Sequence, residues 1–160
     1  MKKLLVKCQL GTLLLSLFIT FNAYATALSK SQLELEQAVK THQGKVIYLD
    51  FWASWCGPCR KSFPWMNELT QKHDVDKFVV LSVNLDANKA LADKFLLETP
   101  AKFSVIYDPK GKIARHFKIK GMPSSIVFDK QGKIRYTHTG FHTKKIVEYE
   151  KQIAQLMSEE

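Results

Sequence analysis

Two cysteines three positions apart, Cys56 and Cys59, are the residues of this sequence whose type and spacing most directly indicate chemistry. They lie in the run Trp55-Cys56-Gly57-Pro58-Cys59, directly after a mostly apolar segment. A disulfide between them would close a very short loop, and a short loop gains little stability from a crosslink. We therefore expect the pair to alternate between dithiol and disulfide and to exchange electrons with other thiols.

Cys56 is predicted to be the reactive member of the pair because of where it stands. The apolar run over residues 46–51 is typical of a buried strand, and apolar residues recur at helical spacing over residues 59–73. Cys56 therefore lies where a strand gives way to a helix, and the unpaired N–H groups of a helix start favour a thiolate. The thiolate is the nucleophilic form of cysteine. Cys59, inside the helix, would then resolve a mixed disulfide by attacking Cys56.

A zinc site is an alternative for a Cys-x-x-Cys pair, and the rest of the sequence does not supply one. Zinc in proteins usually has about four ligands, and the chain contains no second Cys-x-x-Cys; its one His-x-x-x-His, His138 and His142, lies about 80 residues beyond the cysteines. Its histidines are dispersed over predicted loops and helix ends. The sequence also lacks a glycine-rich nucleotide-binding loop. We therefore expect no metal and no dissociable cofactor.

The first 25 residues have the three-part layout of a secretory signal peptide. A positively charged start is followed by a mostly apolar stretch over residues 10–21, and Ala23-Tyr24-Ala25 then places small residues at the two positions that signal peptidase reads. We expect cleavage after this run and a periplasmic, or otherwise extracytoplasmic, protein. An uncleaved membrane anchor is the alternative, because residues 8–27 could just span a bilayer. Cleavage would also remove the third cysteine, Cys8.

The chain carries a formal charge of +9, which removal of residues 1–25 would lower by three. A basic protein can bind nucleic acid or an anionic membrane. Here the lysines are scattered singly, without the clustered arginines and interleaved aromatic residues of a nucleic-acid-binding face. The charge therefore indicates a solvated basic surface, with no nucleic-acid partner. Residues 26–160 are expected to form one domain that acts as a monomer.

Apolar patterns and turn residues divide residues 26–160 into alternating helices and strands. Strands are expected at 46–51, 78–83, 103–107, 125–128 and 134–138. Helices are expected at 31–44 (opened by a Ser-Gln-Leu-Glu capping box), 59–73, 87–98 and 143–157, with a short helical or irregular piece at 113–119. In the helix over 87–98, Leu91, Phe95 and Leu96 are predicted to face inward. This alternation predicts an α/β fold, with one mixed sheet flanked by helices.

The segment around the cysteines resembles the active-site segment of thioredoxin. The run from Leu49 to Cys59 carries this resemblance, and Asp86 and Gly121-Met122-Pro123 follow in the order of the same family. The extra helix and strand over residues 87–107 resemble the central insertion of the secreted TlpA/ResA-like branch. The resemblance covers about residues 44–157 and implies a thioredoxin-like fold with that insertion.

The resemblance implies roles for the residues around the pair. Cys56 would be the attacking cysteine and Cys59 the resolving one. Pro123, after Met122, would be a cis-proline that lies beside the disulfide and helps to bind the backbone of the substrate. Asp50 matches the buried carboxylate of thioredoxin, a proton acceptor for Cys59, and an apolar strand around it should raise its pKa.

The same resemblance indicates a surface that meets the substrate. This surface is expected to include Trp55, Gly57 and Pro58. Trp52 is expected to pack beneath the site. Two departures matter: Ser82 stands where thioredoxin has a lysine near the buried aspartate, and the secreted branch often lacks that aspartate, whereas Asp50 is present here. An aspartate that caps a strand end or faces solvent is the alternative interpretation of Asp50.

Together these observations predict a periplasmic thiol–disulfide oxidoreductase that reduces disulfides of protein substrates. Its electrons would come from a membrane thiol donor, and the family resemblance allows a role in cytochrome c maturation. A disulfide-forming oxidase on the same fold is the first alternative. A non-enzymatic binding module or chaperone is the second, although such a platform would need neither cysteine, nor Pro123, nor Asp50. A peroxiredoxin-like peroxidase would need a Pro-x-x-x-Thr-x-x-Cys motif, which the sequence lacks.

Overall fold

The computed structural model describes residues 27–159. The predicted signal peptide, its cleavage site after Ala25 and Cys8 lie outside the described residues. In chain order the elements are α1 (Lys30–Thr41), β1 (Val46–Trp52), α2 (Gly57–Lys72), β2 (Phe78–Asn84), α3 (Lys89–Glu98), β3 (Ser104–Tyr107), α4 (Lys112–His116), β4 (Ser124–Phe128), β5 (Ile134–Thr139), a 3₁₀ turn (Thr143–Lys145) and α5 (Ile146–Ser158). Over this described range, no helix is both long enough and apolar enough to cross a membrane.

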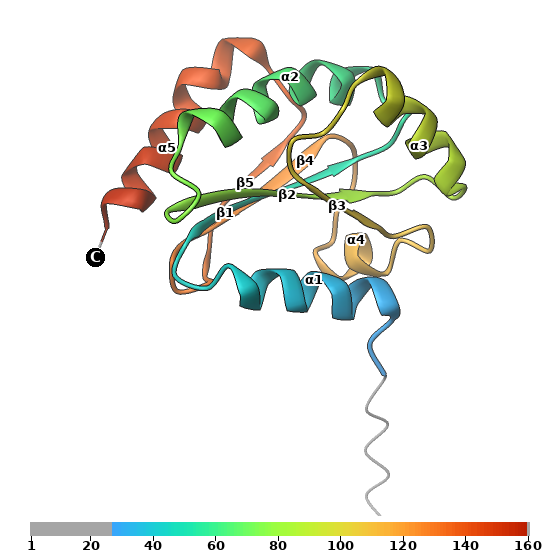
Figure 1. Cartoon of the computed structure of the whole chain (residues 1–160), viewed down its shortest axis with the longest axis horizontal. Coiled ribbons are helices and arrows are strands. Elements are labelled where there is room, and N and C mark those ends of the chain that lie inside the picture. Colours follow the sequence, from blue (N-terminus) through green and yellow to red (C-terminus); the bar gives the residue numbers. More distant parts are fainter. Residues whose placement is uncertain (1–26, 160) are drawn as a thin grey trace, which may run out of the picture.

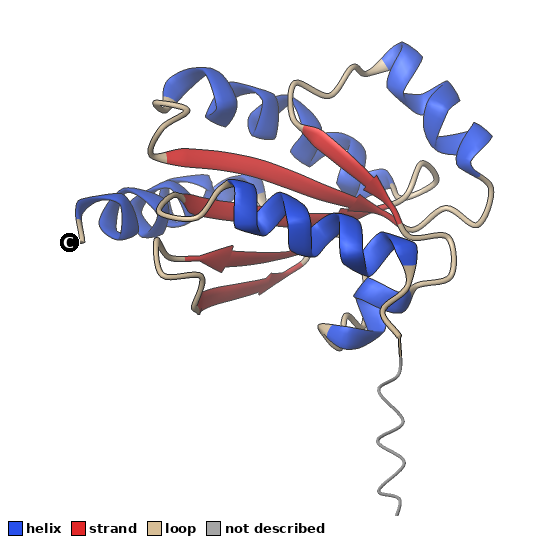
Figure 2. Ribbon diagram, turned by 60° about the horizontal axis from the view of Figure 1, so that its bottom comes forward, coloured by secondary structure: helices blue, strands red, loops and turns tan. Residues whose placement is uncertain are grey.

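The strands form one sheet in the order β3-β2-β1-β4-β5. β1, β2 and β3 run parallel, whereas β4 is antiparallel to β1 and to β5. Helices α2, α3 and α5 cover one face of the sheet, and α1 and α4 cover the other (Figure 1). Figure 2 shows α1 on the near side of the sheet and α2 and α3 on its far side. The predicted α/β fold, with a mixed sheet and an additional helix and strand (α3 and β3) between β2 and α4, is confirmed.

β1 lies at the centre of the sheet, and all of its residues are buried. Successive side chains of a strand point to opposite faces. Tyr48 and Trp52 accordingly pack in the apolar cluster under α2, whereas Leu49 and Phe51 pack in the cluster on the side of α1. Asp50 has the same parity as Tyr48 and Trp52. Strand alternation therefore places a carboxyl group in the core beneath α2.

The start of α1 differs from the prediction by two residues. Ser29, not Ser31, is the N-cap: its hydroxyl accepts from the backbone N–H of Gln32 at 3.4 Å, and the Gln32 side chain accepts from the N–H of Ser29 at 3.0 Å. This Ser-Lys-Ser-Gln box satisfies the capping pattern as well as the predicted Ser-Gln-Leu-Glu box does. Ser31 instead donates to Asp108 at 3.0 Å, a long-range contact that no local pattern reveals.

The inner face of α3 also differs in one residue. Phe95 is buried as predicted, but Leu91 is 50% exposed and Ala92 takes the buried position one turn before Phe95. Leu91 and Ala92 both share a helix face with Phe95, at spacings of four and three residues. Periodicity alone does not choose between them.

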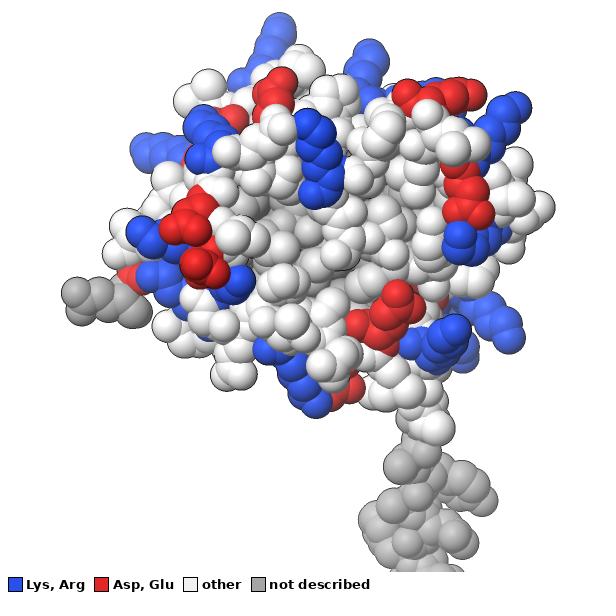
Figure 3. Space-filling view, viewed as in Figure 1, with Lys and Arg blue, Asp and Glu red and all other residues white. Residues whose placement is uncertain are grey.

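Charged side chains are dispersed over the surface in space as well as in sequence. In the view of Figure 3, Lys and Arg atoms are interspersed with Asp and Glu atoms, and no large patch of one sign appears. Several opposite charges are paired, as in the ion pairs of Lys89 with Asp93 and of Arg135 with Asp129. The exposed pair of Lys89 and Asp93 contributes little to stability, whereas Asp129 in the other pair is buried.

Candidate active site

Cys56 and Cys59 are joined by a disulfide at the start of α2, with an S–S distance of 1.98 Å. Cys56 is the N-cap of the helix, and the backbone N–H of Cys59 points at the Cys56 sulfur at 3.3 Å. Pro58 stands in the first turn, where its missing N–H removes no helical hydrogen bond. α2 thus begins at Gly57, two residues before the predicted start, and this earlier start puts Cys56 at the cap.

The cap position favours negative charge on the Cys56 sulfur. The first N–H groups of a helix have no partner within it, and the helix dipole places partial positive charge there. In the reduced protein, the Cys59 N–H that now meets the sulfur would donate to a thiolate. In the disulfide form Cys56 is 4% exposed and Cys59 only 1%. Both cysteines are thus buried in this form, and Cys56 differs from Cys59 by its place at the helix cap.

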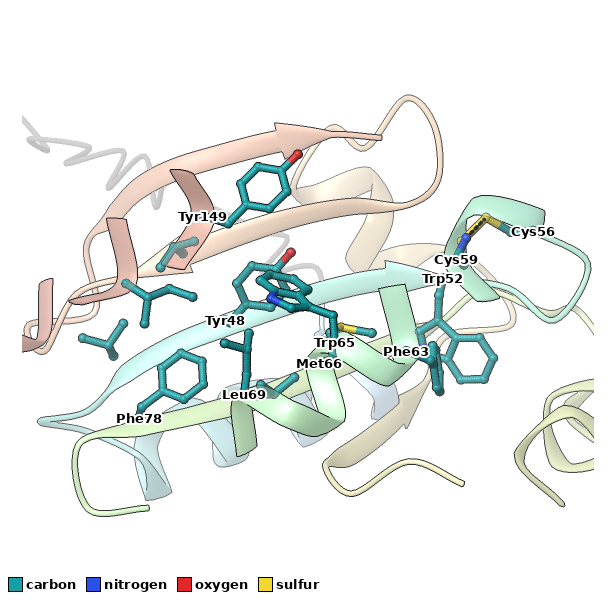
Figure 4. Packing of buried hydrophobic residues seen from close by; sticks show 14 of the residues in the cluster. Tyr48, Trp52, Cys56, Cys59, Phe63, Trp65, Met66, Leu69, Phe78 and Tyr149 are labelled. Atoms are coloured by element: carbon teal, nitrogen blue, oxygen red, sulfur yellow. Dashed lines mark hydrogen bonds between the residues drawn. A yellow bond between two sulfur atoms is a disulfide. The ribbon is translucent and has the colours of Figure 1, made fainter. Parts of the chain in front are cut away.

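An aromatic cluster supports the disulfide from below. The Trp52 ring packs on Phe63 and Phe95, with ring centroids 4.8 and 5.2 Å apart, and Phe63 packs edge-on against Phe95 at 4.9 Å. Figure 4 shows Trp52 and Phe63 next to Cys59 at the end of β1. The Trp52 N–H donates to the Ser82 hydroxyl at 3.2 Å, which fixes the orientation of the indole. Trp52 thus packs beneath the site, as predicted, and its contacts with Phe63 and Phe95 join α2 and α3 to the sheet.

Asp86 fixes the turn that leads into Cys56. Its carboxylate accepts from the backbone N–H and the hydroxyl of Ser54, both at 2.8 Å, and from the Asn84 amide at 2.7 Å. Asp86 is only 2% exposed, so these donors replace water around its charge. The sequence indicated Asp86 only by its place in the family order. The polar residues Asn84 and Asp86 at the end of an apolar strand were the signal that could have identified this contact with Ser54, called the Asp86–Ser54 clamp below.

Asp50 is a buried acid without a hydrogen-bond partner for one of its oxygens. The residue is 1% exposed, and its Oδ2 atom makes no hydrogen bond in this disulfide form. Burial raises the pKa of Asp50 well above its ordinary value, which is the direction expected from the apolar strand around it. The alternative of a solvent-facing aspartate is therefore wrong. A carboxyl group in this state keeps its proton to a higher pH than an ordinary aspartate does.

Met122 and Pro123 come to the same end of the sheet as the disulfide. The Met122–Pro123 peptide bond is cis, Pro123 is buried, and Met122 packs against the apolar cluster that contains both cysteines. The next residue, Ser124, pairs with Phe51 near the end of β1, immediately before the active-site turn. The antiparallel β1–β4 pairing is therefore what brings residues so far apart in sequence to one place.

A hollow of about 210 Å³ lies between the active-site turn and α3. Trp55, which is 70% exposed, forms one wall, and Leu91 and Phe95 form the other. The Arg60 guanidinium lies over the Phe95 ring at 4.8 Å, and its Nε donates to the Ser54 carbonyl at 3.3 Å. Leu91, predicted to face inward, instead lines this hollow. The added helix α3 thus contributes to the surface next to the active-site turn.

Comparison with known proteins agrees with this geometry. The family model described as Redoxin matches residues 21–153. The chain belongs to the Redoxin family. Within this family it is 32% identical, over 133 residues, to the thiol-disulfide oxidoreductase ResA of Bacillus thuringiensis, covering 82% of this chain and 75% of that protein.

Two solved structures extend the comparison. A thiol:disulfide interchange protein DsbE from Chlorobium tepidum is 47% identical, with a TM-score of 0.73, over 75% of this chain and 85% of that one. The exposed lipoprotein thioredoxin Etrx1 of Streptococcus pneumoniae is 31% identical, with a TM-score of 0.63, over 74% of this chain and 90% of that one. This Redoxin-family chain is thus a thiol–disulfide oxidoreductase of the ResA/DsbE type, and Cys56 and Cys59 are its redox pair.

Proposed function

We propose that the protein is an extracytoplasmic, monomeric reductase of protein disulfides, in which Cys56 attacks and Cys59 resolves. The observation that carries this proposal is the Cys59 N–H aimed at the Cys56 sulfur at 3.3 Å, with Cys56 as the cap of α2. That donor and the helix dipole favour a thiolate on one sulfur of the pair only. The two cysteines therefore have unequal roles.

In the proposed cycle the Cys56 thiolate attacks one sulfur of a substrate disulfide. The S–S bond of the substrate breaks, one substrate thiolate leaves, and a mixed disulfide forms on Cys56. Cys59 then loses its proton and attacks the Cys56 sulfur, which releases the second substrate thiol and leaves Cys56–Cys59 oxidised. Two electrons have passed to the substrate. A membrane thiol donor would restore the dithiol through the reverse exchange.

Asp50 is the proposed acceptor for the Cys59 proton. Both residues lie on the side of the sheet that α2 covers, and the raised pKa of Asp50 makes it a stronger proton acceptor than an ordinary carboxylate. The surface proposed to hold the substrate backbone and the residues next to its cysteine consists of Trp55, Gly57, Pro58, Met122 and Pro123. Trp55 has the exposure that such a contact requires.

The extracytoplasmic location rests on the N-terminal sequence, and the similarity to the exposed lipoprotein Etrx1 agrees with it. Residues 1–25 are proposed as a signal peptide that is removed, which makes 26–160 the mature domain. The intact mass of protein isolated from its native compartment tests this step. A mass that retains Met1–Ala25 would instead indicate a membrane-anchored enzyme with the same active site.

The direction of electron flow follows from how strongly the reduced form is stabilised. Strong oxidants of this fold have potentials near about −120 mV, and thioredoxin lies near about −270 mV. Gly57 and Pro58 place no histidine beside the sulfur, and an ionised Asp50 beneath the site would oppose a thiolate. We expect a potential of roughly −200 to −270 mV, measured by equilibration with glutathione. A value near about −120 mV, with the protein found oxidised in its compartment, would favour the disulfide-forming oxidase instead.

A further inference from the structure

A row of polar side chains crosses the otherwise apolar face of the sheet beneath α2 and α5. β-sheet pairing places Ser125 of β4 directly opposite Asp50 of β1, and His138 of β5 directly opposite Ser125. On the other side of Asp50, its partner in β2 is Ser82. Directly opposed residues of an antiparallel pair have Cβ atoms only about 4.5–5.5 Å apart. The row therefore runs from the buried carboxyl group to the edge of the sheet.

The outer half of this row is a continuous hydrogen-bonded chain. The Ser125 hydroxyl lies 2.9 Å from Nδ1 of His138, and Nε2 of His138 lies 2.8 Å from the Oε1 atom of Gln152 in α5. An amide oxygen only accepts, so Nε2 carries the hydrogen and Nδ1 of the neutral ring accepts from Ser125. The Tyr48 hydroxyl can take one of the two lone pairs of the Ser125 oxygen, which leaves the other for a neighbour. Both hydrogen bonds of this row thus donate in the same direction, from Ser125 in the core toward Gln152 at the edge of the sheet.

The two ends of the row differ sharply in their access to water. Asp50 is 1% exposed and Ser125 3%, whereas His138 is half-buried and lines a polar hollow of about 410 Å³. Tyr48, on the same face, interacts with both Ser125 and Asp50; burial, and next the charge of Asp50, raises its pKa well above the ordinary value. Tyr48 therefore stays protonated. It does not compete with Asp50 as a proton acceptor.

The surroundings of His138 keep its ring neutral near neutral pH. Burial lowers the pKa of His138, and the charge of Lys145 adds to this, although the hydrogen bond with Gln152 and the charge of Glu148 oppose it. The ionisable side chains that share the hollow with His138 are Arg135, Tyr136, His142, Lys145, Glu148 and Tyr149. Toward the core it faces Ser125, with Tyr48 and Asp50 beyond. A neutral ring can accept a proton that arrives from the core.

We propose that Ser125 and His138 form the proton path that connects Asp50 to solvent. This inference rests on the proposed role of Asp50 as the acceptor for Cys59. In the outward step, the Asp50 carboxyl proton passes to the Ser125 oxygen, the Ser125 hydroxyl proton passes to Nδ1 of His138, and the Nε2 proton of the imidazolium passes to water in the hollow. The inward step is the reverse, and it restores the starting tautomer of His138.

Asp50 needs such a path because its work requires both protonation states. It must be ionised to accept the Cys59 proton, and it must be protonated to return one when Cys59 leaves as a thiolate. The apolar cluster around it leaves Asp50 no direct contact with water. Ser82, its neighbour on the other side, offers no such route for a proton. The Ser82 hydroxyl donates to the Ser104 backbone carbonyl at 3.2 Å, and that carbonyl has no proton to pass on.

The test is a pH-jump experiment on the oxidised protein, with the Asp50 carboxyl group followed by its infrared C=O band. Asp50→Asn identifies the band. Ser125→Ala and His138→Gln should slow its relaxation by about 100-fold, the low end of what a positioned proton-transfer group contributes. Ser125→Thr should restore the rate because it keeps the hydroxyl. Ser82→Ala removes a hydroxyl from the same row, but on the side of Asp50 away from Ser125. In this control the Asp50 band should relax at the wild-type rate.

A second readout links the path to the reaction. Reduced protein held at acid pH and then mixed with a disulfide substrate at neutral pH should resolve the mixed disulfide without delay in the wild type and after a lag in Ser125→Ala. If the Asp50 band relaxed at the wild-type rate in both Ser125→Ala and His138→Gln, the proposed proton path would be wrong. If Asp50→Asn itself resolved the mixed disulfide at the wild-type rate, the proposed role of Asp50 would fail instead, so the two failures are distinguishable.

Discussion

Replacing Asp50 with asparagine should make the oxidised protein more stable as the pH rises, relative to the wild type. Asp50 is 1% exposed, its Oδ2 atom has no hydrogen-bond partner, and burial raises its pKa well above 3.8. Below about pH 4 the carboxyl group is neutral in both the folded and the unfolded chain. Above that pH the unfolded chain releases the proton before the folded one does. The wild type therefore loses stability until the pH passes the folded-state pKa, and the Asp50→Asn variant, which has no proton to release there, does not.

The size of this effect follows from the difference between the two pKa values. Every tenfold change in the acid dissociation constant on folding corresponds to about 1.4 kcal/mol. A difference in the free energy of unfolding that is the same at every pH reports how well the asparagine amide fits the site. Only the part of the difference that changes with pH reports the pKa of Asp50. His42, His73 and His138, whose pKa values are lowered mainly by burial, give the opposite slope near neutral pH. They are present in both proteins, so their contribution cancels in the difference.

The measurement is urea unfolding of both oxidised proteins from about pH 4 to about pH 8, with the slope of unfolding against urea checked for constancy. Asp108→Asn is the matched control, because Asp108 is also 1% exposed but accepts from the backbone N–H groups of Lys112, Ile113 and Ala114. That variant should be destabilised throughout. A gain for Asp50→Asn of less than about 1.4 kcal/mol across this range would refute the reasoning about Asp50.

Three further substitutions test the architecture of the site. Asp86→Asn should lower the free energy of unfolding by about 1.5–3 kcal/mol and slow disulfide exchange, because Ser54 loses a charged acceptor, and urea unfolding with insulin-reduction kinetics measures both effects. Phe63→Ala should cost about 3–5 kcal/mol through the cavity it leaves under Trp52, and an unfolding curve unchanged from the wild type would contradict the role of the aromatic cluster. Trp55→Ala should change stability by less than about 0.5 kcal/mol, since Trp55 is 70% exposed, yet raise the KM for a protein disulfide; an unchanged KM would remove Trp55 from the substrate surface.

The sequence allowed the elements and the redox pair to be predicted because their signals are local. Apolar runs, turn residues and the Cys-x-x-Cys spacing placed β1, α2 and the active-site turn to within about two residues. Where the prediction differs, two local patterns were equally good: Ser29 and Ser31 both begin a capping box, and Leu91 and Ala92 both share a face with Phe95. Only packing against the rest of the chain decides between such alternatives.

The contacts that position the site could not be predicted in the same way, because they join distant parts of the chain. Asp86 lies far from Ser54 in the sequence, and the clamp between them exists only because β1 and β2 end side by side. His138 faces Ser125 because of the register of the β4–β5 pair. A shift of one residue in either pairing would turn these side chains to the opposite face. The sequence identifies such residues only as polar positions in or after strands.

The unequal roles of the two cysteines are tested most directly by trapping a substrate on each single-cysteine variant. Cys59→Ser, reduced and exposed to a protein disulfide, should accumulate a mixed disulfide through Cys56, because the resolving thiol is missing while the thiolate at the cap of α2 remains. Cys56→Ser should trap little or nothing. Each variant keeps one of the two sulfur atoms of the same site, so each is the control for the other. Equal or greater trapping on Cys56→Ser, with Cys59 labelled by iodoacetamide faster than Cys56 in the reduced wild type, would contradict the assignment of Cys56 as the nucleophile.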